Sequence, residues 1–155
     1  MTTHPLLSPL AGLVGRWSGR GEGSYPTIDP FDYEETLSFT DSGRPFLAYS
    51  QRTSDPLDQR PLHTEVGYLR VPAPGRAELV VAQATGIVEV CEGTTAGGRI
   101  DLVSTVVAKT STALGVTAVE RHLAFGADLL SYEVLVAMAG QPLTRHLVAE
   151  LRREG

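Results

Sequence analysis

The stretch "GRWSGRGEGSYPT", residues 15–27, decides the fold. In an extended chain, successive side chains point to opposite faces. One face would therefore carry Gly15, Trp17, Gly19, Gly21, Gly23 and Tyr25, while polar residues fill the other. A face this bare lets a strand coil sharply where a barrel closes. It also leaves flat space that a planar ligand can approach, and the sequence leaves both uses open. The glycine spacing does not match the GxGxxG or P-loop patterns of phosphate-binding loops.

The rest of the chain repeats short runs of alternating apolar and polar residues, rich in Val, Thr, Tyr and Phe and bounded by Gly, Pro and Asp. The runs cover residues 31–39, 44–53, 62–71, 77–85, 86–93, 99–110, 115–125 and 128–138. With the glycine-rich segment they predict an all-β fold of about ten antiparallel strands. We expect residues 1–155 to form a single domain, and a closed barrel is favoured because closure removes exposed strand edges. A short helix or 3₁₀ turn around 8–14 should cap the barrel, and Trp17 should plug its closed end.

The last segment, "PLTRHLVAELRREG" at 142–155, is ambiguous. Leu143, Leu147 and Leu151 recur every four residues, which is a helical spacing. In a strand, Leu147, Ala149 and Leu151 would instead share one face. The local pattern by itself favours the helix.

Composition and charge exclude several classes of protein. The chain has 155 residues, is 42% hydrophobic and carries a net charge of −5, so neither a nucleic-acid partner nor an anionic membrane is expected. Its one cysteine, Cys91, cannot form an internal disulfide, and we expect a buried thiol in a cytoplasmic protein. The N-terminus lacks the features of a signal peptide, and no apolar run is long enough to span a membrane.

The titratable residues show no familiar catalytic constellation. The four histidines are widely separated, at His4, His63, His122 and His146, which argues against a zinc site. Glu34 and Glu35 are adjacent and would face opposite ways on a strand, so they cannot act as a dyad; we expect Glu35 to pair with an arginine. A CxxCH motif for covalent haem attachment is absent.

Two histidines have alternative interpretations. His63 precedes Glu65, and it could lie near a bound ligand or form a hydrogen bond that ties strands together. We favour the second role. His122 is flanked by Glu120 and Arg121 and is expected at the surface.

Five segments resemble the nitrobindins. "GRWSGRGEGSYPTI" matches the GxWxGxGxG…YPT signature of that family, and "PFDYEETLSF", "GRPFLAYSQRT", "PLHTEVGYLR" and "GQPLTRHL" are similar to further blocks in the same order. The resemblance covers nearly the whole chain. It implies a barrel of about ten strands like that of fatty-acid-binding proteins, holding a ferric b-type haem. It also implies isomerisation of peroxynitrite to nitrate and binding of nitric oxide.

The resemblance assigns particular residues. It implies that His146 is the axial iron ligand and catalytic residue, and that Thr27 touches the haem edge. Many members carry Lys where this chain has Leu114, so a contact to a haem propionate would be missing here. The last segment would then be the closing strand with His146 turned inward. Leu147, Ala149 and Leu151 would form an outward apolar row, able to pack on the N-terminal segment or on a second copy in a homodimer.

Two other functions remain open at this point. One is a non-catalytic barrel that binds fatty acids or another apolar ligand. The other is a haem-based carrier or sensor of nitric oxide without turnover.

Overall fold

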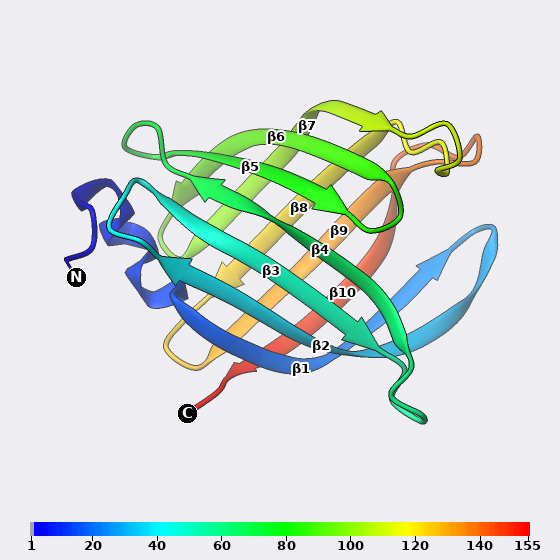
Figure 1. The fold of residues 1–155 in the computed structure, drawn as a ribbon, viewed down its shortest axis with the longest axis horizontal. Helices are drawn as coiled ribbons and strands as arrows, with labels where there is room; N and C mark the ends of the chain where they lie inside the picture. The colour runs from blue at the N-terminus through cyan, green and yellow to red at the C-terminus, as the bar shows by residue number, and fades with distance from the viewer. Residues whose placement is uncertain (1) are drawn as a thin grey trace.

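The computed structural model describes residues 2–155 and is a closed antiparallel barrel (Figure 1). One short 3₁₀ helix precedes ten strands: η1 (Pro5–Leu13), β1 (Gly15–Tyr25), β2 (Ile28–Asp41), β3 (Phe46–Ser54), β4 (Pro61–Arg70), β5 (Arg76–Gln83), β6 (Ile87–Ala96), β7 (Arg99–Lys109), β8 (Ala118–Phe125), β9 (Leu129–Ala137) and β10 (Thr144–Arg153). Each strand pairs with its sequence neighbour, and β1 pairs with β10 to close the sheet. The predicted all-β barrel is confirmed.

The meander places alternate loops at opposite ends of the barrel. The loops β1–β2, β3–β4, β5–β6, β7–β8 and β9–β10 gather at the right in Figure 1, and we call this the open end. Helix η1, both termini and the remaining loops lie at the left, which we call the closed end.

The closed end is filled by apolar side chains. Leu7, Leu10 and Leu13 of η1 are fully buried, as is Trp17 of β1. The Trp17 indole Nε1 donates to the carbonyl of Leu13 at 2.9 Å, and the Arg153 guanidinium lies 4.2 Å from its ring centroid. The prediction that Trp17 plugs this end is confirmed. The cap is a 3₁₀ helix, as expected, but it begins at Pro5.

The inward face of β1 carries the glycines, as the alternation predicted. A Cβ on Gly21 would overlap the ring of Tyr33, and one on Gly23 would overlap the ring of Phe31. Both aromatic residues belong to β2 and lie directly across from these glycines in the register. The space left by the missing side chains is therefore occupied at these two positions by the chain's own rings, and a planar ligand would meet those rings first.

The C-terminal segment is a strand, although its spacing is helical. β10 pairs with both β1 and β9, and this tertiary pairing overrides the local pattern. The predicted outward row is wrong: Ala149 and Leu151 are buried in the core, and Leu147 packs against it. The cause is a β-bulge, since the β9–β10 register pairs Arg145 and Leu147 with consecutive residues and skips His146. Both His146 and Leu147 can therefore line the interior.

Candidate functional site

A cavity of about 750 Å³ opens at the loop-rich end of the barrel. Its volume lies in the range of small-molecule and cofactor sites. The lining comes from nearly every strand and several open-end loops, and it includes Phe31, Asp32, Tyr33, Asp55, Arg60, His63, Glu65, Glu89, Leu114, Arg121, Met138, His146 and Leu147. The cavity joins an apolar wall to a floor of charged groups.

His146 is half-buried and lines this cavity. Its Nδ1 lies 3.0 Å from the carbonyl oxygen of Ser24 on β1. A carbonyl can only accept, so Nδ1 is the donor, and in the neutral form of the ring Nε2 keeps its lone pair. Among residues 2–155, Nε2 has no hydrogen-bond partner. A neutral imidazole fixed through one nitrogen and open at the other is the arrangement of a haem or metal ligand.

Two aromatic rings fix the orientation of the imidazole. The rings of Tyr25 and Phe31 approach His146 edge-on, with centroids 5.6 Å and 6.5 Å away. The Tyr25 hydroxyl donates to the carbonyl of Val136 at 2.9 Å and accepts from the Met138 amide at 3.1 Å. Tyr25 thus links β1 to the end of β9, on both sides of the strand that carries His146.

The other two residues assigned by resemblance lie at the open end. Thr27 is exposed in the two-residue turn between β1 and β2, and the cavity lining does not include it. Leu114 lies in the β7–β8 loop, lines the cavity and is 73% exposed. Leu114 therefore offers apolar surface at the mouth, where a lysine would offer a charge.

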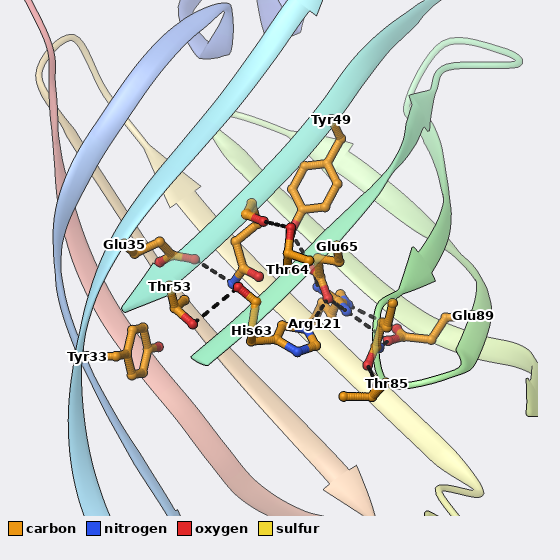
Figure 2. A network of polar contacts seen from close by, with 12 residues as sticks. Tyr33, Glu35, Tyr49, Thr53, His63, Thr64, Glu65, Thr85, Glu89 and Arg121 are labelled. Carbon is orange, nitrogen blue, oxygen red and sulfur yellow. Dashed lines mark hydrogen bonds and ion pairs between the residues drawn. The ribbon is translucent and has the colours of Figure 1, made fainter. Parts of the chain in front are cut away.

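The cavity floor is a buried ionic network, shown in Figure 2. Arg121 on β8 donates to Glu65 from Nη1 at 2.8 Å and to Glu89 from Nη2 at 2.8 Å. Burial alone would raise the pKa of Glu65, but the charge of Arg121 and hydrogen bonds from His63, Arg121 and Tyr49 hold it well below its usual range. The two carboxylates in turn raise the pKa of Arg121 despite its desolvation. Alternation along β8 places Arg121 on the inward face with Val119, a signal that sequence reasoning missed.

Glu35 lies in the same layer but makes different contacts from those predicted. Its carboxylate accepts hydrogen bonds from the Tyr132 hydroxyl at 2.7 Å and from Gln51 Nε2 at 2.5 Å, so the expected pairing with an arginine is wrong. Arg20 instead contacts Glu34 on the outer face. Burial raises the pKa of Glu35 to about 7, although hydrogen bonds from Tyr132 and Gln51 oppose the shift.

Two further histidines and the cysteine do not share one environment. His63 lines the cavity and bonds Glu65 of its own strand at 3.2 Å, so its side chain does not tie two strands together. His122 is on the outer side, in contact with Asp101 and Glu120. Cys91 is fully buried as predicted, and burial with the nearby Glu89 raises the pKa of its thiol to about 12.

Within residues 2–155, no group of three or more His, Cys, Asp or Glu side chains is arranged to hold a metal ion. In the same range, no helix is both long enough and apolar enough to cross a membrane.

Comparison with known proteins agrees with the geometry. Residues 6–153 match the family described as the THAP4-like, heme-binding beta-barrel domain. A peroxynitrite isomerase of Nocardia farcinica is 49% identical over 97% of this chain and 92% of its own length. Peroxynitrite isomerase 2 of Mycobacterium avium is 50% identical over 97% and 96%. The crystal structure of Rv2717c from M. tuberculosis superposes with a TM-score of 0.94 at 43% identity, covering 99% and 100% of the two chains. The chain therefore belongs to the THAP4-like, heme-binding β-barrel family, as its resemblance to the nitrobindins predicted.

Proposed function

We propose that this protein binds a ferric b-type haem through His146 and isomerises peroxynitrite to nitrate. The observation that carries the proposal is the imidazole in the open-end cavity, with Nδ1 bound to the Ser24 carbonyl and Nε2 available. The relatives named peroxynitrite isomerase, which are 49% and 50% identical over 97% of this chain, support the reaction.

The chain's own residues prepare the site in three ways. The Ser24 carbonyl selects the tautomer that can ligate iron and orients the ring. Phe31, Leu147 and Val136 supply apolar surface along the cavity, which suits the faces of a porphyrin. The bulge at His146 brings the ligand and Leu147 to the same wall. When bound, ferric haem supplies a Lewis-acidic iron at which peroxynitrite rearranges to nitrate.

The charges in the cavity argue against a fatty-acid carrier. A fatty-acid carboxylate bound deep in a barrel needs a cation, and Arg121 is the buried cation of this lining. Arg121 is already paired with Glu65 and Glu89. The carboxylate of a fatty acid would be a third negative charge beside one cation, and it would not be compensated. A planar ring that carries no carboxylate at its inner edge and has its acid groups at the mouth suits this charge distribution better.

Replacing the ligand tests the proposal. His146→Ala should remove the histidine-ligated Soret spectrum and reduce catalysed peroxynitrite decay to the buffer rate, because the imidazole whose Nε2 is available in the cavity is lost. His122→Ala, on the outer side, is the matched control and should keep both signals. Circular dichroism checks that the barrel is intact. An unchanged Soret band in His146→Ala would remove this residue from the mechanism.

We propose that the haem also binds nitric oxide, that Thr27 contacts its edge, and that residues 1–155 act as one domain in the cytoplasm. Nitrate yield against buffer separates an isomerase from a nitric oxide carrier without turnover. A homodimer remains a prediction, without support from the apolar row on β10 because that row faces inward; sedimentation velocity tests it.

A further inference from the structure

The two arginines that line the cavity differ in how well they are paired with carboxylates. Four carboxylates and two guanidinium groups contribute to the lining: Asp32, Asp55, Glu65, Glu89, Arg60 and Arg121. Arg121 is bound on both sides by buried carboxylates. Arg60 is the other arginine of this lining, and its side chain is 65% exposed.

The loop that carries Arg60 is held in place by hydrogen bonds. The amide of Asp55 donates to the carbonyl of Arg60 at 2.8 Å, and the amide of Gln59 donates to the carbonyl of Asp55 at 2.9 Å. The Gln59 side chain donates to Glu34 of β2 at 3.0 Å, which attaches the loop to the barrel wall. The backbone therefore fixes the base of Arg60 at the cavity mouth while its guanidinium stays accessible.

Within residues 2–155, the Arg60 guanidinium has one weak partner, the Asp55 carboxylate. Its Nη2 lies 3.5 Å from Asp55 Oδ2, and the pair is exposed to solvent. Exposed ion pairs of this length contribute little to stability, so a better-placed carboxylate can replace Asp55. A guanidinium can also bind a carboxylate through two parallel hydrogen bonds.

The β7–β8 loop, in contrast to the loop that carries Arg60, contributes an apolar residue to the cavity mouth. Leu114 lines the same cavity from that loop and brings no charge. The β3–β4 and β7–β8 loops lie at the same end of the barrel (Figure 1). The β3–β4 loop therefore supplies a cation at the cavity mouth, and the β7–β8 loop does not.

We propose that Arg60 is the anchor for a haem propionate in this protein. The inference rests on the proposed function, since it requires haem in the cavity. The guanidinium binds a propionate carboxylate at the mouth, and the ring extends inward between the apolar wall and His146. The carboxylates of the floor favour this orientation, because they repel acid groups from the deep part of the cavity.

The test compares two ligands and two arginines. Apoprotein is titrated with hemin and with hemin dimethyl ester, whose propionates carry no charge, and Soret absorbance gives each dissociation constant. Arg60→Ala should weaken hemin binding about 3–10-fold, as expected for an exposed charged pair, and leave the ester unchanged. Arg52→Ala, an exposed arginine of β3 outside the cavity lining, is the matched control and should change neither. The hemin effect should shrink as salt concentration rises.

A second variant keeps the test decisive. Leu114→Lys in the Arg60→Ala background should recover hemin affinity but not ester affinity, because it restores a cation at the mouth. Equal losses for hemin and ester, or a hemin loss no larger than that of Arg52→Ala, would overturn the anchor. A wild-type protein that shows no Soret band with either ligand would contradict the proposed function as well, whereas a normal band with no selective loss contradicts the anchor alone.

Discussion

The two ends of the barrel are built from the same strands, but one end is packed with apolar side chains and the other encloses a cavity. On β1, Trp17 is buried in the closed end, while the Tyr25 ring packs edge-on against His146 at the open end. On β10, Leu151 is fully buried and His146 lines the cavity. Apolar burial concentrates at one end, and a histidine with an available nitrogen lies at the other. We therefore expect that changes in the loops and charges at the mouth leave the core undisturbed.

The ionic layer lies between these two regions. Arg121 and Val134 line both the main cavity and a void of about 30 Å³ on its far side, which is otherwise largely apolar. Buried charges cost free energy unless they are paired and hydrogen-bonded, so the layer is stable only while its network is complete. Three substitutions test how independently the two ends behave.

The largest effect is expected at the closed end. Trp17→Ala should lower the free energy of unfolding by about 4–5 kcal/mol, because it leaves a cavity and removes the bond to Leu13. Urea denaturation measures the loss, with Trp17→Phe as the milder control. Below the unfolding transition, the Soret band should match that of wild type. Loss of haem binding by a folded Trp17→Ala protein would show that the two ends are coupled.

An intermediate effect is expected in the ionic layer. Arg121→Met should cost about 3 kcal/mol at pH 8, because Glu65 and Glu89 would be left buried and unpaired. The deficit should shrink as pH falls and the unpaired carboxylates take up protons. Adding Glu65→Gln and Glu89→Gln should recover most of the stability. A deficit that does not change with pH would contradict an electrostatic cause.

The smallest effect concerns Glu35 and depends on pH. Its pKa of about 7 in the folded protein exceeds the ordinary value of about 4.3, so the folded state binds more protons between these values. Wild-type stability should therefore fall as pH rises from about 4.5 to 7. Glu35→Gln should be more stable than wild type by about 1–2 kcal/mol at pH 8, with the advantage vanishing near pH 4.5.

The Gln51 amide allows this substitution. Its Oε1 is buried without a hydrogen-bond partner in the described part of the chain, and it can accept from the new amide if the Gln51 group turns over. Thermal unfolding of both proteins across pH 4.5–8 is the measurement. A constant difference over that range would mean that Glu35 is not the group that titrates.

Much of the barrel was predictable from sequence because strand alternation and turn residues are local signals. The glycine-rich face of β1, the plug at Trp17 and the buried thiol of Cys91 all followed from such patterns. The inward charge of Arg121 was also available from the alternation of β8, since it shares a face with Val119. That signal was missed because His122 and Glu120, its neighbours, are polar on the outer face.

The sequence by itself determined the strands, the bare inner face of β1 and, through its resemblance to a family, the candidate histidine. It did not determine which way β10 presents its residues. Period-2 alternation allows His146 or Leu147 on the inner face, but not both, and a bulge set by pairing with β9 admits both. The partners of Glu35 likewise come from β3 and β9, far away in the chain. Only closure of the barrel brings such groups together, because register and long-range contact are properties of the paired sheet and not of any single strand.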